Sequence, residues 1–449
     1  MDTQLLDSYG SLPENIRAFY LDARAIFAGN PTADFSDPSI VKAARDHGLP
    51  LMGGPMLGDL RTDGVAMWLR PASTEPLTIK VGKKSIWIKK VQPGVAQKIE
   101  ISGLKPGSAY TYMILLKKQV VAEGGFTTAP VADGKGVFRI AFGSCFHKIG
   151  LHNPNLVREI LKRKPSAMLL LGDIAVDDRE NRINMHRADY QLRDVSTAWK
   201  KLAMNLPLYT SWDDHDYFND DLSGIPEGFT AADRSMVRAV WRQNWNNPSA
   251  EDGREGVWFN TRIGPVEVIM LDTRSCRDNQ RRHEYGSYLG EPQMKWLKET
   301  LKNSTAPFKL ISSGTMWSDY VSKAKDTWGS WDTEAREEIF SLIEKEKIGG
   351  VMLMSGDRHG ARAFRIPRPS GFNFYEFEPA TLGGVPGPPG LVQNCPEQLF
   401  GYDGIGFIAF GEFTFDTTVQ KPEVTFRLIS EAGSVLEKWV LPYAELSPS

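Results

Sequence analysis

VMLMSGDRH, residues 351–359, is an apolar run that stops at a Ser-Gly pair and then brings an Asp, an Arg and a His into one short loop. An apolar run bounded by turn residues is typical of a buried strand in a covered sheet. Two other runs end in the same way: AMLLLGD at Asp173, and PLYTSWDDHD at three carboxylates around His215. Because ligands bind outside the carboxyl ends of strands in open α/β sheets, these strand ends predict one shared polar site.

The composition is that of an ordinary globular protein, and 449 residues are enough for two or three domains. The net charge of −2 gives no sign of a nucleic-acid-binding surface. No apolar run approaches the roughly 20 residues that a membrane-spanning helix needs. Residues 1–15 lack the basic start and the apolar core of a signal peptide. We therefore expect either a cytoplasmic protein or an exported one whose signal is absent from this sequence.

Changes of pattern along the chain predict a division into parts. Residues 1–50 hold two stretches with helical spacing and form an N-terminal helical extension. Residues 51–130 are short alternating segments between Gly and Pro turns, typical of an antiparallel β-sandwich. Their phrases LKPGSAYTYMI and FTTAP resemble the later strands of fibronectin type III domains. Residues 137–449 start with strand, crossover helix and strand and end in antiparallel β segments, which predicts an α/β domain.

Metal-ligating side chains follow the first two strands of this α/β domain. Cys145 comes directly after VFRIAF, and a thiolate is a strong metal ligand, although a buried inert thiol is the alternative. Three cysteines argue against a disulfide framework. Asp173 ends the next strand, and Asp177 and Asp178 follow it. Carboxylates this dense favour a bound cation, the alternatives being a helix cap and a solvated acidic loop.

The other two strand ends combine carboxylates with histidines. Asp214 and His215 are adjacent and project in different directions, so one can hold a metal while the other faces substrate. His215 can then protonate a leaving alkoxide, and Asp216 can orient its imidazole. Asp357 and His359 are two residues apart, so in an extended segment both can reach one centre. A helix-capping cluster is the alternative at WDDHD.

The motifs GSC, GDxxxxD, WDDHD and SGDxH, in this order, resemble those of the PhoD-like alkaline phosphatases, a branch of the calcineurin-like metallophosphoesterases. GVAMWLRP, GPVEVIMLDTRSCRD and LGEPQMKWLKETLKNSTAPFKLISSG fit as well, and the resemblance covers about residues 52–380. It implies an α/β (α+β) metallophosphoesterase sandwich, with two mixed β-sheets flanked by helices, preceded by an all-β domain. In the wider superfamily the first strand ends in an Asp-x-His pair, where this chain has Gly143-Ser144-Cys145.

The resemblance also implies a set of ligands for two metal ions: Cys145, Asp173, Asp214, Asp357 and His359. Asp173 would bridge the two ions, which in the family are Fe³⁺ and Ca²⁺, while the spacings leave Zn²⁺ and Mn²⁺ open. The family commonly has a tyrosine three residues after the bridging aspartate, and this chain has Val176 there. Asp177 or Asp178 would then fill that coordination place.

The expected function is hydrolysis of phosphate monoesters or diesters by a hydroxide that two bound metal ions generate. His215 would face the phosphate, and the predicted substrate contacts are Asn219, Arg274 and Arg358. A sulfatase or a polymer-acting phosphodiesterase on the same site stays open, as does a non-catalytic binding protein with a structural metal. Because PhoD-like proteins are usually exported, we expect a periplasmic or secreted location, with a cytoplasmic one open. The sequence sets no oligomeric state.

Overall fold

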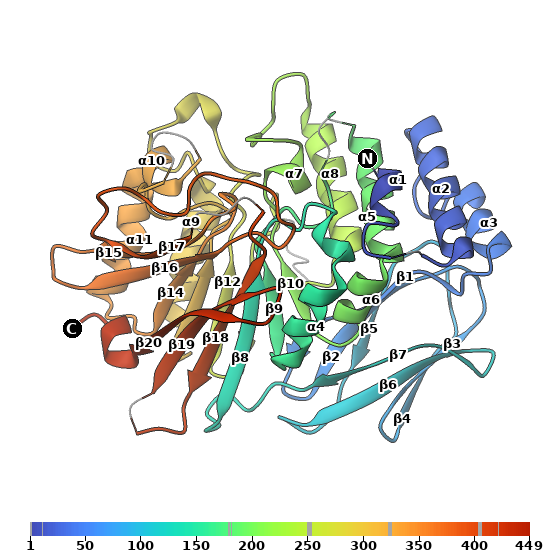
Figure 1. The fold of residues 1–449 in the computed structure, drawn as a ribbon, viewed down its shortest axis with the longest axis horizontal. Coiled ribbons are helices and arrows are strands. Elements are labelled where there is room, and N and C mark those ends of the chain that lie inside the picture. Colours follow the sequence, from blue (N-terminus) through green and yellow to red (C-terminus); the bar gives the residue numbers. More distant parts are fainter. Residues whose placement is uncertain are drawn as a thin grey trace.

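The computed structural model describes residues 2–10, 12–177, 180, 182–248, 254–321, 326–402, 406–420 and 422–449. A large α/β body fills most of the molecule, and a smaller β-sandwich and the N-terminal helices lie beside it (Figure 1). Within the described residues, no helix is long and apolar enough to cross a membrane.

Helices α1 (Asp2–Leu5), α2 (Glu14–Gly29) and α3 (Pro38–Asp46) lead the chain. The start of α3 is set locally, because the Asp37 carboxylate accepts the backbone N–H of Ser39 and Pro38 occupies the first turn. Helix α2 packs on α3 and on α5 (His186–Val195) of the body. The helical extension therefore covers part of the α/β body.

The β-sandwich consists of two antiparallel sheets. One has the order β1-β2-β5 and the other β4-β3-β6-β7. The alternating pattern of β3 buries Leu77, Ile79 and Val81 and leaves Lys80 exposed, as one face of a packed sheet requires. The strand bounds are β1 (Leu51–Arg61), β2 (Gly64–Pro71), β3 (Leu77–Val81), β4 (Lys84–Ile88), β5 (Gln97–Ile101), β6 (Ala109–Leu116) and β7 (Gln119–Thr127).

Two mixed sheets form the centre of the body, in the orders β10-β9-β8-β18-β19-β20 and β11-β12-β13-β14-β16-β15-β17. Strands β8 to β10 are parallel in the first sheet, and β12 to β14 are parallel in the second. This is the predicted α/β (α+β) sandwich of two mixed sheets. The first sheet comprises β8 (Val137–Gly143), β9 (Ala167–Leu170), β10 (Leu208–Thr210), β18 (Ala409–Asp416), β19 (Glu423–Ser430) and β20 (Val435–Pro442). The second comprises β11 (Phe259–Ile263), β12 (Val266–Met270), β13 (Phe308–Ser312), β14 (Val351–Met354), β15 (Ala361–Pro367), β16 (Asn373–Pro379) and β17 (Gln398–Tyr402).

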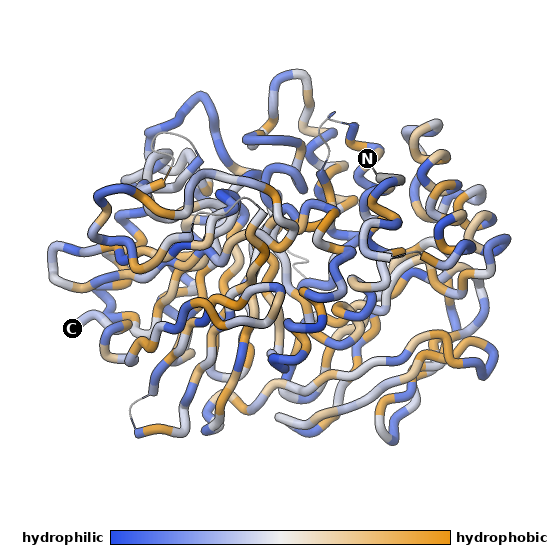
Figure 2. The backbone as a smooth tube through the Cα atoms, in the orientation of Figure 1, coloured by the Kyte–Doolittle hydropathy of each residue, from blue (hydrophilic) through white to orange (hydrophobic). Residues whose placement is uncertain are grey.

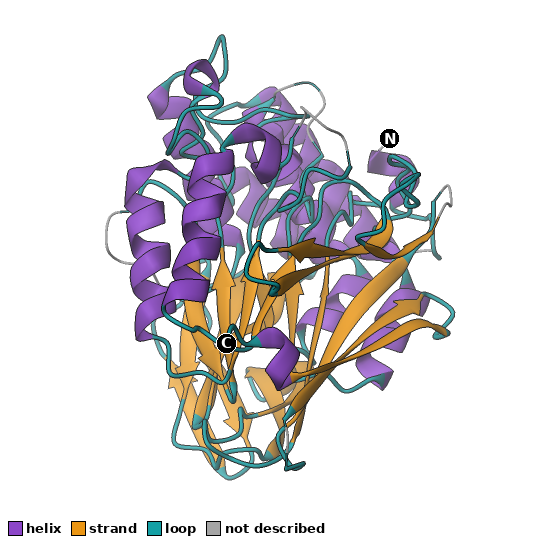
Figure 3. Cartoon of the chain, turned by 90° about the vertical axis from the view of Figure 1, so that its left-hand side faces the viewer, coloured by secondary structure: helices purple, strands orange, loops and turns teal. Residues whose placement is uncertain are grey.

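Helices cover the outer faces of the two sheets, and the sheets pack on each other between them (Figure 3). Strand β8 is buried on both faces. Ala141 packs against the helices on one face, while Ile140 and Phe142 pack toward the second sheet on the other. Figure 2 shows apolar residues concentrated along these central strands. Helices α4 (Pro154–Lys162), α5, α6 (Thr197–Ala203) and α8 (Ala231–Asn244) cover the first sheet, and α9 (Gly290–Asn303) and α11 (Thr333–Lys345) cover the second. Short helices are η1 (Gly150–His152), η2 (Ile183–Met185), α7 (Asp214–Tyr217), η3 (Asn279–Arg281), α10 (Trp328–Trp331) and η4 (Tyr443–Leu446).

The sequence patterns do not predict β15, β16 and β17. For β15 and β16 the reason is visible in the structure: Arg362, Glu376 and Glu378 are all buried on these two strands and interrupt the apolar pattern that marks a buried strand. Their charges are matched by partners, since Arg362 lies 3.2 Å from Glu378 and Glu376 accepts the backbone N–H of Ser318 at 3.1 Å.

A buried hydrogen bond ties the β-sandwich to the body, because the Leu60 backbone N–H donates to the Tyr209 hydroxyl at 2.6 Å. Tyr209→Phe leaves this buried N–H without its partner, which costs about 1–3 kcal/mol. We expect a lower midpoint of denaturant unfolding, measured by circular dichroism, and little change for Tyr9→Phe at an exposed side chain. Equal midpoints for the two variants would contradict the role of this bond.

Candidate metal centre

The predicted ligands stand at the carboxyl ends of four strands that meet at one place. Cys145 follows β8, Asp173 follows β9, Asp214 begins α7 after β10, and Asp357 and His359 follow β14. Neighbouring strand ends are hydrogen-bonded, with the Cys145 backbone N–H donating to the Gly172 carbonyl at 2.9 Å. Because β8 and β14 belong to different sheets, the centre joins the two layers of the body.

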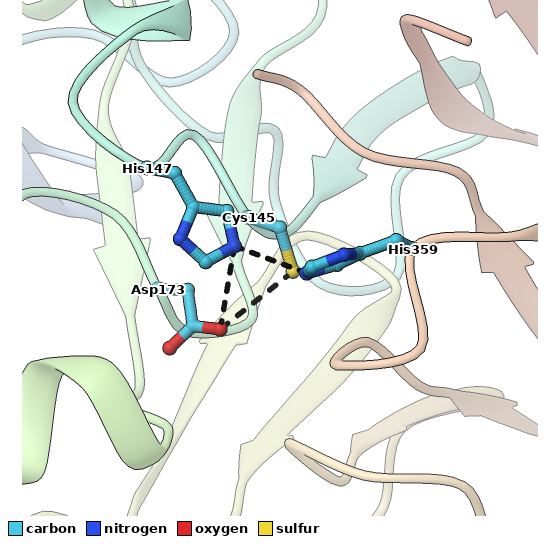
Figure 4. A group of neighbouring side chains, drawn as sticks. All are labelled: Cys145, His147, Asp173 and His359. Carbon is cyan, nitrogen blue, oxygen red and sulfur yellow. Dashed lines mark hydrogen bonds and ion pairs between the residues drawn. The ribbon is translucent and has the colours of Figure 1, made fainter. Parts of the chain in front are cut away.

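One group of potential ligands combines sulfur, nitrogen and oxygen donors (Figure 4). Its members are Cys145, His147, Asp173 and His359, whose ligand atoms all lie within 4.8 Å of one another. The His147 and His359 Nε2 atoms are 3.0 Å apart, and Asp173 Oδ2 is 3.8 Å from His147 Nε2 and 3.9 Å from Cys145 Sγ. Thiolate, imidazole and carboxylate together suit zinc or iron.

A second group consists of carboxylates: Asp213, Asp214 and Asp357 lie within the same 4.8 Å limit. Asp173 also groups with Asp214 and His215, so its carboxylate lies between the two sets of ligands. Burial, followed by repulsion from Asp214, raises the pKa of Asp173, and burial with repulsion from Asp213 does the same for Asp357. A bound cation would reverse this effect, so the donor set fits metal ions.

The backbone at the ligands adopts an unusual conformation. Cys145, His147, Asp173, Asp357 and His359 have φ values of 58°, 45°, 55°, 69° and 55°. Side-chain-bearing residues rarely adopt this left-handed region, and such strain gathers at functional sites. Each residue here turns the chain sharply just past a strand end, and Figure 4 shows the side chains of Cys145, His147, Asp173 and His359 pointing toward one another.

The proline-rich loop at residues 385–390 determines which nitrogen of His359 faces the centre. The Pro386 carbonyl lies 3.0 Å from His359 Nδ1, and because a carbonyl only accepts, Nδ1 carries the proton. The lone pair on Nε2 is then directed at the ligand group, as in metal-binding histidines. Arg362 holds the same loop by donating to the Pro388 carbonyl at 3.2 Å.

Arg274 supplies positive charge to the carboxylate group. It is predicted from the sequence to contact substrate, but in the structure it is fully buried, donates to Asp213 and lies 2.6 Å from Asp326. Its NH2 group is 4.0 Å from Asp214 and 3.9 Å from Asp357. These distances describe a side chain that neutralises carboxylates behind the site rather than one that reaches into solvent.

The His215 imidazole lies beside a different aspartate from the one expected. Its Nδ1 lies 3.2 Å from Asp177 Oδ1, and its Nε2 lies 3.8 Å from the exposed Asp220 carboxylate. Asp216, predicted to orient the imidazole, instead accepts the Ile174 backbone N–H at 3.2 and 3.3 Å. Asp216 therefore organises the loop after Asp173. Asp177, predicted as a metal ligand, lies beside the imidazole and belongs to a further group of potential ligands with His147 and His215.

The remaining predicted residues are placed at the margin of the centre or beyond the described chain. Arg358 forms an ion pair with Asp357 at 3.1 Å. Asn219 is partly exposed, and its side-chain oxygen accepts the backbone N–H of Asp220 at 2.8 Å. Asp178 lies outside the residues that the structure describes.

The groups of potential ligands also contain His147, Asp213 and His215, which the sequence patterns do not predict as ligands. A signal for His147 exists: Cys145, Phe146 and His147 have the spacing of the Asp-x-His pair in the wider superfamily, with Cys in place of Asp. His147 lies in the loop past the strand end, so strand alternation cannot place its side chain. Only the left-handed turns at Cys145 and His147 bring it back to the centre.

Two solved structures share this architecture. The structure of PhoD matches with a TM-score of 0.67 at 19% identity, covering 88% of this chain and 89% of that one. A purple acid phosphatase from yellow lupin (Lupinus luteus) seeds matches with a TM-score of 0.62 at 13% identity, covering 87% of this chain and 75% of that one. With its ligand groups at the strand ends, the chain has a metallophosphoesterase-like fold.

A family model described as PhoD-like phosphatase matches residues 155–384, slightly more than half of the chain. The chain belongs to this family. It is also 23% identical over 399 residues to alkaline phosphatase D of Bacillus subtilis (strain 168). That alignment covers 71% of this chain and 66% of the relative, so the chain spans just under two thirds of the relative's length.

Metal content tests the assignment of His147. We expect two cations per chain by elemental analysis of the purified protein, and one fewer in His147→Ala and in Cys145→Ser, because both side chains belong to the mixed-donor group. His152→Ala is the matched control, since His152 is buried nearby on η1 but belongs to none of the ligand groups found among the described residues. Unchanged metal content in His147→Ala would exclude this residue as a ligand.

Gly387→Ala tests whether the proline-rich loop positions His359. A Cβ atom at Gly387 would overlap the Arg358 carbonyl and lie 2.6 Å from His359 Cβ. The loop would shift and the bond from His359 to Pro386 would be lost, so metal affinity should fall about tenfold or more, as for other residues that orient metal ligands. Gly136→Ala is the control, because a Cβ atom there meets nothing within 4 Å. Titration with a chelator of known affinity measures the difference, and equal affinities would exclude this role.

Proposed function

We propose that the chain hydrolyses phosphate esters at this centre with two bound metal ions. The observation that carries the proposal is the position of Asp173 between a mixed-donor group and a carboxylate group at one set of strand ends. Two ions held there would offset the charge on the phosphate oxygens and lower the pKa of a water molecule.

The donor sets suggest which residues would hold each ion. Cys145, His147 and His359, with Asp173, offer the soft and borderline donors that suit iron or zinc. Asp214 and Asp357, with Asp173, offer oxygen donors that suit calcium or manganese. Iron and calcium stay predictions from the family resemblance, as does the periplasmic or secreted location.

In this proposal His215 acts as the general acid. Its backbone N–H donates to Asp173 at 3.2 Å and to Asp214 at 2.9 Å, so the peptide carrying the imidazole is fixed to two of the ligand residues. Asp177 faces Nδ1, which favours a proton there, while Nε2 lies on the side of the exposed Asp220. In the proposed reaction the Nε2 proton passes to the oxygen of the leaving alcohol, and Nδ1 keeps its proton beside Asp177.

His215→Ala should reduce kcat on nitrophenyl phosphate about 100-fold or more, because general acid catalysis is lost, while two metal ions remain bound. Asp177→Asn should cause a smaller loss, since the imidazole stays but loses the charge beside Nδ1. The matched control is His47→Ala, which removes the ion pair between His47 Nε2 and Asp22 Oδ2, 2.7 Å apart. Both residues lie far from the centre in the sequence. A His215→Ala variant with full activity would exclude this role.

The same assay with a bis(nitrophenyl) phosphate and with nitrophenyl sulfate separates the substrate classes. We expect both phosphate esters to be hydrolysed faster than the sulfate. Faster hydrolysis of the sulfate would identify a sulfatase, and absence of turnover in the metal-loaded protein would favour a binding protein with structural metal.

A further inference from the structure

The outer face of the sheet β4-β3-β6-β7 carries apolar side chains that the β-sandwich core does not use. Pairing aligns Trp87 with Thr78, Thr78 with Leu115, and Leu115 with Val120, so these residues form one row across the four strands. Trp87 is 63% exposed and Val120 51% exposed. Met113, in the adjoining row, is 40% exposed. The Trp87 face, as we call Trp87, Met113, Leu115 and Val120, is therefore an apolar surface in contact with solvent.

Lysines surround one end of the Trp87 face. Residues 77–123 contain nine lysines, no arginine and only two acidic residues, Glu100 and Glu123, within a chain whose net charge is −2. Leu77 pairs with both Ile88 and Leu116, so the segment after β4 and the turn between β6 and β7 lie at the same end of the sheet. That end carries four exposed lysines: Lys89, Lys90, Lys117 and Lys118.

The lysines and the tryptophan also contact each other. Lys89 Nζ lies 4.9 Å from the centre of the Trp87 ring, and Lys117 forms an ion pair with Glu75 at 2.9 Å. The buried face of this sheet packs on the other sheet of the sandwich, and β6 and β7 also contact the α/β body, because the Tyr112 hydroxyl donates to the Met204 carbonyl at 2.8 Å and the Gly125 backbone N–H donates to the Asn205 side chain at 3.2 Å. Trp87 and Val120 lie on the solvent-facing side of the sheet, where a partner can reach them.

We propose that the Trp87 face binds the surface of an anionic phospholipid bilayer. Tryptophan is favoured at the boundary between lipid headgroups and acyl chains, where its ring meets both polar and apolar surroundings. Lysines beside it keep their charged ends at the headgroups while their stems cover apolar surface. Each lysine near an anionic membrane adds electrostatic attraction to the headgroups.

The apolar side chains favour a bilayer over a soluble polyanion. A nucleic acid or an acidic polysaccharide would match the lysines, but it offers little apolar surface to Leu115, Val120 and Met113. Trp87 could still stack on a base or a sugar ring, which is why the test includes a soluble polyanion. The row of side chains extends across four strands, so it suits a broad surface better than a narrow strand of polymer.

Co-flotation of the full chain with vesicles tests the proposal. We expect binding to phosphatidylcholine vesicles that contain phosphatidylglycerol, much weaker binding to pure phosphatidylcholine, and release at high salt. Trp87→Ala should weaken binding roughly fivefold or more through lost apolar burial. Replacing Lys89, Lys90, Lys117 and Lys118 by Gln should weaken it about tenfold or more.

Matched controls remove the same chemistry from other surfaces. Val120→Ser should also weaken binding, and Val435→Ser is its control, because both valines are about half exposed on edge strands. The control for the four lysines replaces Lys295, Lys302, Lys345 and Lys347, all exposed, by Gln. It removes the same number of positive charges from a different surface. Equal loss in controls and test variants, or no binding to anionic vesicles, would overturn the proposal. Binding to heparin or DNA that matches the vesicles in strength and is unaffected by Trp87→Ala would also overturn it and assign the face to a soluble polyanion. Melting temperatures of the variants show whether the sandwich remains folded.

Discussion

Repulsion among buried carboxylates is the constraint on which the site depends. Burial raises the pKa of Asp213 to about 7 even though Arg274 opposes the change, whereas for Asp214 burial is outweighed by Arg274 and His215 and the pKa falls. Arg274 is itself shared with Asp326, so it offsets only part of the charge. The other carboxylates, Asp173 and Asp357, have raised pKa values and need a further cation. The strand ends bring these carboxylates close enough together for such a cation to bind between them.

Support for the ligands comes from charged groups that are themselves buried and paired. Glu378, whose pKa burial raises to about 7 against the effect of Arg362, accepts the Gly360 backbone N–H at 3.3 Å, directly after His359. Arg362 then reaches the proline-rich loop that fixes the His359 tautomer. Buried polar groups behind a metal ligand thus hold it in position. Because these groups lie on β15 and β16, the two strands lack an uninterrupted apolar pattern.

Much of this fold and site could be predicted from sequence, because apolar runs that end in Asp or His mark the carboxyl ends of buried strands. That reasoning brings Cys145, Asp173 and Asp357 together. The same reasoning does not predict the position of a side chain that depends on the conformation of a loop. His147 reaches the centre through left-handed turns, and Asp177 rather than Asp216 faces His215, because short-range spacing cannot show which way a loop carboxylate points.

The proposed ligands come from both sheets, which has a consequence for how the protein matures. The β8, β9 and β10 ends supply Cys145, Asp173 and Asp214 from one sheet, and the β14 end supplies Asp357 and His359 from the other. A nascent chain that has not yet reached residue 359 holds only part of the ligand set, so complete metal capture follows synthesis of the second sheet. Ions bound at this centre would link the two layers, so their loss would weaken the attachment of one sheet to the other.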